Sequence, residues 1–300
     1  MNAKPKRRRI LVWLQYAIAG FCSVTVGGVS LIVWQALHPA RFAMSANPGD
    51  DGIAFEDVSF PSRDGFTLSG WWAPANTPVG TVILCHGYPA DRRDVFPVIP
   101  FLHKAGFNVL AFDFRRLGKS GGGMSTIGLR EPRDLEGAVD YAAKRSDRPI
   151  TAMGWSMGAA ACIMAAAADK RIVAVIADSP YTSLDVQTVR RFGGGPFGRL
   201  CGGYAAWLGE IILREHLSDA SPLDSARRLG GRPLFLIHSR NDRLIPMRDS
   251  ERIFAAVNGP RELWITGASG HIRSYGECTV EYRKRVLRFL HSAVGKAVSR

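Results

Sequence analysis

The sequence has few cysteines and lacks the spacings that bind metals or cofactors. Its five cysteines stand far apart, with no C-x-x-C pair and no cysteine/histidine cluster, so a zinc site of the usual spacing is excluded. No H-E-x-x-H sequence, no EF-hand loop and no dinucleotide-binding fingerprint after a predicted strand is present. Gly118-Lys119-Ser120 resembles the end of a phosphate-binding loop, but aspartate stands at position 113 where that loop needs glycine. We therefore expect no metal and no cofactor.

Basic blocks are also absent beyond the N-terminus. The formal net charge is +13, but Lys4, Lys6, Arg7, Arg8 and Arg9 stand directly before a long apolar run, and without these five charges the remainder carries +8. That remainder is spread as single or paired arginines, a pattern typical of a solvated or membrane-facing surface. We therefore expect no nucleic-acid partner.

An uncharged apolar run occupies residues 10–37 and comprises 28 residues. It exceeds the roughly 20 residues that span hydrocarbon and is much longer than the apolar part of a signal peptide. Trp13, Tyr16 and Trp34 lie towards its two ends, where aromatic rings favour the membrane interface. The sequence predicts a transmembrane signal anchor at 10–37 that follows a cytoplasmic tail at 1–9. A signal peptide cleaved near Ala43-Met44-Ser45 is the alternative.

The distribution of basic residues predicts the orientation of this anchor. The N-terminal cluster precedes it, whereas Arg41 is the only lysine or arginine in the first twenty or so residues after it. The positive-inside rule then places the N-terminus in the cytoplasm and the rest of the chain outside. An oxidising exterior would permit a Cys201–Cys278 disulfide, while free buried thiols are the simpler expectation.

The remainder is predicted to be one α/β domain at 53–300 after a linker at 38–52. Two alternating segments, 53–62 and 67–75, indicate an antiparallel pair. Near-continuous apolar runs then alternate with helical patterns such as 131–145 and 281–294, which is typical of a mostly parallel sheet with helices on both faces. These runs are 81–87, 108–114, 150–155, 172–178, 233–239 and 262–267.

One long insertion interrupts the alternation, at about 188–217. A G-G-G-P sequence at 193–196 is followed there by an apolar, helix-like run at 200–213. Because long insertions between strands often cover functional sites, we expect a lid over the site. Bulky side chains at Leu200 or Trp207 should then change the size of substrate that the site accepts.

The pattern G-W-S-M-G at 154–158 supplies a candidate nucleophile. It follows the apolar run 150–155 and opens an alanine-rich segment that favours a helix. Small residues on both sides let the serine hydroxyl stand exposed at a tight strand-to-helix turn. The bare pattern is common by chance, so its place between strand and helix carries the prediction of Ser156 as nucleophile. The alternative is a serine that merely ends a strand.

A serine hydroxyl needs a base within hydrogen-bond reach and a carboxylate that orients that base. His271 lies just past the last apolar run, in G-A-S-G-H, and is the predicted base. The other six histidines are assigned packing, surface or loop-bracing roles. For the acid, Asp242 after run 233–239 is favoured over Asp178 at the end of run 172–178, because Asp178 can instead cap the turn that follows it.

Charge on a substrate carbonyl oxygen needs two fixed N–H donors. The backbone N–H of Met157, directly after the nucleophile, is one prediction. The other is the N–H of Tyr88, in the loop after run 81–87, with His86 bracing that loop. Asp113 is interpreted, with Arg115, as a structural ion pair and turn former.

These motifs together resemble the α/β-hydrolase superfamily. The resemblance rests on H-G-Y at 86–88, D-F-R-R-L-G-K-S at 113–120, G-W-S-M-G at 154–158, N-D-R-L-I-P at 241–246 and G-A-S-G-H at 267–271. More narrowly, residues 53–294 are similar to serine aminopeptidase-like and dienelactone-hydrolase-like lipases and esterases. The likeness implies an α/β-hydrolase fold and hydrolysis of acyl esters through an acyl-enzyme. Arg116 departs from the glycine that is common in that turn.

The expected partner is a small-molecule or lipid-like ester, met near a membrane. An acyltransferase, thioesterase or peptidase that uses the same three residues is the alternative, because one fold hosts several chemistries. A non-catalytic binding protein of the same fold is a further alternative. Dehalogenase and epoxide-hydrolase chemistry in this fold uses an aspartate nucleophile, which Ser156 excludes.

Overall fold

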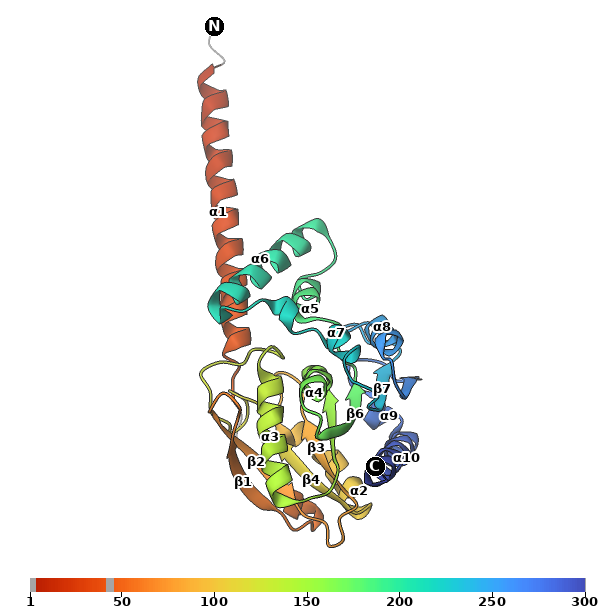
Figure 1. Cartoon of the computed structure of the whole chain (residues 1–300). Helices are drawn as coiled ribbons and strands as arrows, with labels where there is room; N and C mark the ends of the chain where they lie inside the picture. The colour runs from red at the N-terminus through yellow and green to blue at the C-terminus, as the bar shows by residue number, and fades with distance from the viewer. Residues whose placement is uncertain (1–3, 42–45, 300) are drawn as a thin grey trace.

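The computed structural model describes residues 4–41 and 46–299. One long helix, α1 (Lys4–Leu37), projects from a layered α/β body (Figure 1). The alternative cleavage point at Ala43-Met44-Ser45 lies outside the described residues. α1 is long and apolar enough to cross a membrane, and only 11% of its most apolar window is buried.

The body is built on one eight-stranded sheet of order β1-β2-β4-β3-β5-β6-β7-β8. β1 pairs with β2 and β2 with β4 in antiparallel fashion, and every other neighbouring pair is parallel. Every residue of β3, β4, β5 and β7 is buried, which explains their continuous apolar runs. The strands are β1 (Glu56–Pro61), β2 (Thr67–Ala73), β3 (Gly80–Cys85), β4 (Phe107–Phe112), β5 (Ile150–Trp155), β6 (Ile172–Asp178), β7 (Leu234–Ser239) and β8 (Arg261–Thr266).

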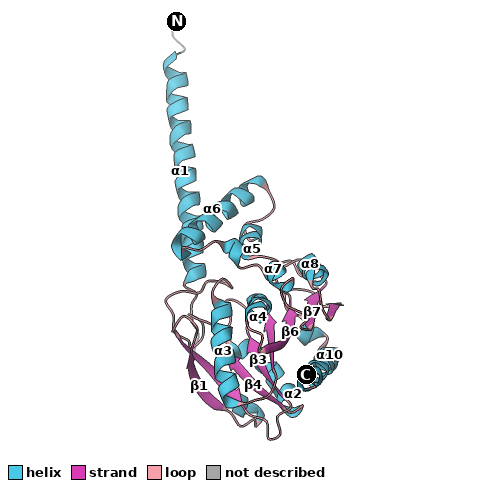
Figure 2. Ribbon diagram, in the orientation of Figure 1, coloured by secondary structure: helices cyan, strands magenta, loops and turns pink. Residues whose placement is uncertain are grey.

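Helices cover both faces of the sheet (Figure 2). One core cluster joins the sheet to α3 (Glu131–Arg145), α4 (Met157–Ala168), α7 (Pro222–Ala226) and α8 (Arg248–Ala256). A second cluster, on the other face, involves α2 (Ile99–Lys104), α9 (Ser274–Glu277) and α10 (Thr279–Val298). Short 3-10 helices lie at η1 (Pro48–Asp51), η2 (Arg92–Val98) and η3 (Leu217–Asp219). The predicted mostly parallel sheet with helices on both faces is confirmed.

A third apolar cluster lies beyond one edge of the body and contains the predicted insertion. The insertion forms two helices, α5 (Leu184–Arg190) and α6 (Pro196–Leu213). Their apolar side chains pack against Val29, Val33 and Leu37 of α1. The last turns of α1 are therefore part of the folded body, a contact that the sequence did not predict.

The interpretation of Asp113 and Arg115 as an ion pair is wrong. The Asp113 carboxylate accepts the Lys119 N–H at 2.8 Å, within its own loop. It also lies 3.3 Å from the guanidinium of Arg92, at the start of η2. Arg115 points the other way and pairs with Asp134 at 2.7 Å. Asp113 is still a turn former, as expected.

Two further sequence features are settled by the structure. Arg116 has a φ of 66°, which is the left-handed conformation that glycine adopts most easily; this explains why a glycine is common in that turn. All five cysteines are free. The Cys201–Cys278 disulfide does not form, because Cys201 is buried beside α1 and Cys278 lies between α9 and α10.

Candidate active site

Ser156 stands at the turn from β5 to α4, where the chain reverses sharply. Its φ is 53°, a strained conformation that persists only where the surroundings enforce it. A Cβ at Gly154 would lie 2.4 Å from the backbone of Gly158, and a Cβ at Gly158 would lie 2.1 Å from Cys85 O. Both positions thus require glycine, because the strand, the helix and the β3 loop approach too closely for any side chain.

Three predicted residues meet at the carboxyl edge of the sheet. His271 Nε2 lies 2.8 Å from Ser156 Oγ, and His271 Nδ1 lies 2.7 Å from Asp242 Oδ2. Asp242 follows β7 and His271 follows β8, so each residue comes from the end of a different strand. The order is hydroxyl, imidazole, carboxylate, which is the geometry that can remove a proton from a serine.

Asp242 is held as a charged carboxylate. Its Oδ1 accepts the backbone N–H groups of Leu244 and Ile245, each at 2.9 Å. Burial opposes ionisation, but hydrogen bonds from the neighbouring histidines and the backbone outweigh it and hold the pKa of Asp242 well below its ordinary value. An ionised Asp242 can fix the His271 ring and stabilise its cation.

Asp178, the other candidate acid, occupies a different position. Its Oδ1 accepts the hydroxyl of Ser179 at 2.9 Å and its Oδ2 accepts that of Tyr282 at 3.3 Å. Burial raises the pKa of Asp178 to about 6. Its backbone carbonyl accepts the Ser156 N–H at 2.8 Å. Asp178 therefore supports the turn that carries Ser156, while Asp242 is the carboxylate that touches His271.

The loop after β3 lies directly against the serine. A Cβ at Gly87 would lie 3.4 Å from Ser156 Cβ. His86 braces this loop as expected, because its Nδ1 lies 2.7 Å from Gly87 O and its Nε2 accepts the Phe114 N–H at 3.1 Å. Tyr88 lies in this loop, and its side chain lines the same cavity as Ser156 and Met157.

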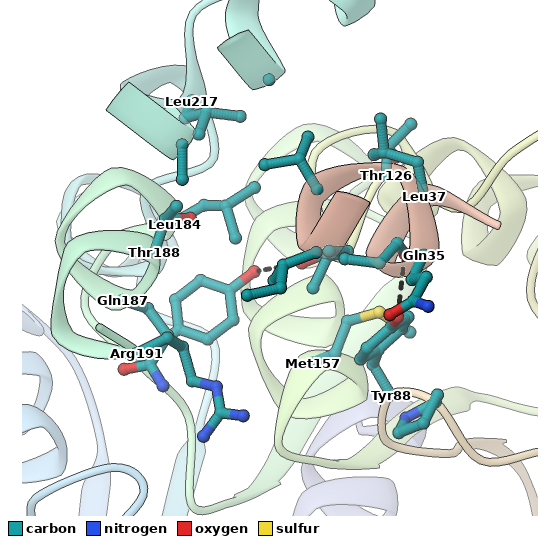
Figure 3. Close-up of a pocket in the computed structure, with 18 of the residues that line it drawn as sticks. Gln35, Leu37, Tyr88, Thr126, Met157, Leu184, Gln187, Thr188, Arg191 and Leu217 are labelled. Atoms are coloured by element: carbon teal, nitrogen blue, oxygen red, sulfur yellow. Dashed lines mark hydrogen bonds between the residues drawn. The ribbon is translucent and has the colours of Figure 1, made fainter. Parts of the chain in front are cut away.

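A cavity of about 500 Å³ is lined in part by Ser156. Figure 3 shows other residues that line it, among them Tyr88 and Met157. The cavity walls are mostly apolar and come from the β3 loop, from α4, from both insertion helices and from the last turns of α1. The contributing residues include Tyr88, Met157, Leu184, Ala205, Gly209 and Leu213, and from α1 Ile32, Val33, Gln35, Ala36 and Leu37. Within residues 4–41 and 46–299, no group of three histidine, cysteine or acidic side chains is placed to hold a metal.

Sequence reasoning missed the contribution of α1 to this cavity and misplaced two side chains of the insertion. The apolar run 10–37 contains two polar amides, and only one of them, Gln35, lines the cavity. Leu200 and Trp207, expected to shape the acyl preference, point outward and are 71% and 55% exposed. Helical periodicity turns them away, so that Ala205 and Gly209 line the cavity instead.

Comparisons with known proteins agree with this fold. A family model described as "alpha/beta hydrolase fold" matches residues 80–210. The chain is 31% identical over 248 residues to protein YqkD of Bacillus subtilis, covering 77% of each chain. It is 29% identical over 257 residues to protein YfhR of Escherichia coli K12, covering 82% of this chain and 84% of that one.

Among solved structures, esterase Pf2001 of Pyrococcus furiosus is similar, with 33% identity and a TM-score of 0.72. The match covers 85% of this chain and 98% of the esterase. The hydrolase GrgF of Penicillium, at 22% identity and a TM-score of 0.66, shares the fold alone. With the sheet, the serine turn and these relatives together, the chain belongs to the α/β-hydrolase superfamily and is an esterase-like hydrolase.

Proposed function

We propose that this protein is a membrane-anchored serine hydrolase that cleaves carboxylic (acyl) esters. The observation that carries the proposal is the continuous hydrogen-bonded series from Ser156 through His271 to Asp242, with distances of 2.8 and 2.7 Å. Such a series activates a hydroxyl that is otherwise a poor nucleophile. The apolar cavity beside it supplies room for an acyl chain.

The reaction proceeds in two halves. Ser156 Oγ attacks the ester carbonyl carbon while His271 Nε2 takes the hydroxyl proton, and the carbonyl oxygen becomes negatively charged. The backbone N–H groups of Met157 and Tyr88 are the proposed donors to that oxygen. The intermediate collapses as the C–O bond breaks, and His271 returns the proton to the leaving alcohol. In the second half, water attacks the acyl carbon while His271 takes its proton. The bond to Ser156 Oγ then breaks, His271 returns the proton to Ser156, and the free acid is released.

The other chemistries of the same three residues differ in which group leaves or which group captures the acyl chain. A thioesterase expels a thiol, a peptidase expels an amine, and an acyltransferase passes the chain to an alcohol or amine. The mostly apolar cavity favours an acyl chain over a peptide, because a peptide backbone would need hydrogen-bonding partners along the wall. A non-catalytic binding role would not require a charged Asp242 against His271.

Anchoring by an uncleaved α1 is part of the proposal. Five residues of the last turns of α1, all of 32–37 except Trp34, line the cavity, and Tyr88 donates its hydroxyl to Ala36 O at 2.8 Å. Cleavage near Ala43 would remove this wall. The cavity therefore supports a signal anchor that stays attached to the domain, at residues 10–37, and the linker at 38–52 keeps the domain beside the bilayer.

Hydrolysis of an ester panel graded by acyl length tests this function. Full-length protein in detergent should cleave acyl esters, with Ser156→Ala as the inactive control that keeps the small side chain needed in the turn. Added alcohol or amine measures transfer. Release of free acid as the main product supports the proposal, whereas predominant acyl transfer, or no cleavage of any ester, contradicts it.

A further inference from the structure

Apart from Arg199 in its first turn, which donates to Gly194 O, the outer face of α6 is apolar where a helix on a soluble domain would be polar. Leu200, Gly203, Trp207 and Ile211 lie three or four residues apart and are all exposed, so they form one outward stripe along the helix. Glu210 is turned away from this stripe and accepts the Leu217 N–H at 3.0 Å. The outward stripe of α6, as defined by these four residues, carries no charge.

The stripe is continuous with the membrane-spanning helix. Phe197 in the first turn of α6 contacts Phe21 of α1, with ring centroids 5.8 Å apart. Farther along, Ser30 Oγ lies 2.9 Å from Tyr204 Oη. α6 therefore contacts the second half of α1, which it crosses obliquely with its last turns nearest to α1 (Figure 1).

The length of α1 fixes the level of this contact in a bilayer. The 28 uncharged residues rise about 42 Å, at roughly 1.5 Å each, while the hydrocarbon core is about 30 Å thick. With the charged Arg9 held at one boundary, the hydrocarbon extends to about Val29. Phe21 lies within it, and Phe197, which touches Phe21, lies at the same level. The first turns of α6 therefore lie within the leaflet that faces the domain.

We propose that the outward stripe of α6 lies against this leaflet, with Leu200 in the hydrocarbon and Trp207 at the interface, and that the ester substrate is a membrane amphiphile whose acyl chain reaches Ser156 from the bilayer. The substrate half of this proposal rests on the proposed ester hydrolysis. The inner face of α6 supplies Ala205, Gly209 and Leu213 to the cavity, so the cavity is one helix away from the lipid.

α1 offers a direct path between lipid and cavity. Ile32 lines the cavity and is also 51% exposed on the outside of α1. It lies about one turn beyond Val29, so its exposed side faces the interfacial layer of the bilayer while its other side faces the cavity. An acyl chain that passes Ile32 would cross only the interfacial layer before it reaches the apolar wall of the cavity.

The position of the stripe can be measured without any activity. In vesicles of phosphatidylcholine brominated on its acyl chains, emission from Trp207 should be quenched, and the difference between wild type and Trp207→Phe isolates that residue. Loss of the quenched component in Trp207→Phe supports the proposal. Equal quenching in both proteins, or cross-linking of two chains through position 207, would overturn it.

The substrate half is tested with Leu200→Glu and a matched control, Val280→Glu. Val280 is 83% exposed at the start of α10, far from α6. Against a long-chain ester in vesicles, Leu200→Glu should lose at least tenfold while Val280→Glu keeps its rate. Both variants should cleave a short soluble ester as wild type does, which also shows that they fold.

The outcomes separate the two proposals. Equal rates of Leu200→Glu and wild type on the vesicle ester would overturn the route from the bilayer while ester hydrolysis stands. A wild-type protein that cleaves neither ester would overturn the proposed function itself, and with it the substrate half. The quenching result would still decide where α6 lies.

Discussion

At the scale of single residues, two buried aspartates near the same serine have opposite environments. Asp242 receives hydrogen bonds to both oxygens and its pKa is low, so it is ionised. Asp178 receives only two hydroxyl groups in a fully buried position, and burial raises its pKa to about 6. Their environments assign the charged, orienting role to Asp242.

The first prediction concerns these roles. Asp242→Asn should lower kcat by roughly 10³- to 10⁴-fold, because the amide cannot hold the His271 ring in the required tautomer or stabilise its cation. Asp178→Asn should change kcat little, since no hydrogen bond joins Asp178 to His271. Steady-state kinetics on one ester measures both. The reverse ranking would transfer the acid role to Asp178.

The second prediction concerns stability and pH. The folded-state pKa of Asp178 is about 6, above its unfolded value of 3.8, so the folded state binds the proton more tightly. Stability is therefore lost as pH rises from about 4 to 6, and above pH 6 the full cost of burying the charge applies. Asp178→Asn should raise the free energy of unfolding at pH 8 by up to roughly 3 kcal/mol.

This gain should nearly vanish near pH 3.5, where Asp178 is protonated in the folded state and mostly protonated in the unfolded state. Denaturant unfolding of the Ser156→Ala protein, with and without Asp178→Asn, measures the difference at the two pH values. A gain of equal size at both would show that the burial of charge is not its cause.

The sequence predicts the three residues of the candidate site better than it predicts the ion pairs around them. Ser156, Asp242 and His271 follow the ends of apolar runs, and strand ends meet at one edge of a parallel sheet, so their proximity could be predicted. The partner of Asp113 could not, because Arg92 begins the separate 3-10 helix η2 and either Arg92 or Arg115 would satisfy the charge. Which arginine pairs with such a carboxylate depends on tertiary packing, which the sequence pattern does not show.

At the scale of elements, the alternation of runs predicts β5, β6 and α3 at their observed bounds. The packing of α1 could not be predicted, because a run that is apolar on all sides shows no stripe to mark the buried face. Leu200 and Trp207 were misplaced for the same reason: α6 is apolar both towards the cavity and away from it.

The third prediction tests α1 as a wall of the cavity. Ala36→Trp places a large ring in the cavity and should shift the preferred ester to shorter acyl chains. Ala19→Trp is the matched control, because Ala19 lies on the same helix and is exposed outside the body. The ratio of kcat/KM for long and short esters measures the shift. An equal ratio in both variants would place the acyl chain elsewhere.

At the scale of the whole molecule, α1 packs against α6 and the domain, so the three parts are oriented together. The basic tail stands at one end of α1 and the domain at the other, so under the proposed anchoring the orientation of α1 decides the compartment of Ser156. The tail and the scarcity of basic residues after the anchor favour a cytoplasmic N-terminus and an extracytoplasmic domain.

The fourth prediction tests that orientation. A phosphatase that is active only outside the cytoplasm, fused after Arg300, should be active on intact cells. A cytoplasmic reporter at the same position should be inactive. An inactive phosphatase together with an active cytoplasmic reporter would place the domain inside.

The most direct test of the account is whether Ser156 is the nucleophile. A fluorophosphonate reacts with an activated serine and leaves a covalent adduct, which peptide mass spectrometry can locate. Wild-type protein should carry one adduct, on the peptide that contains Ser156, and Ser156→Ala should carry none while its melting temperature stays close to that of wild type. An adduct on Ser156→Ala, or on another serine of the wild type, would contradict the account.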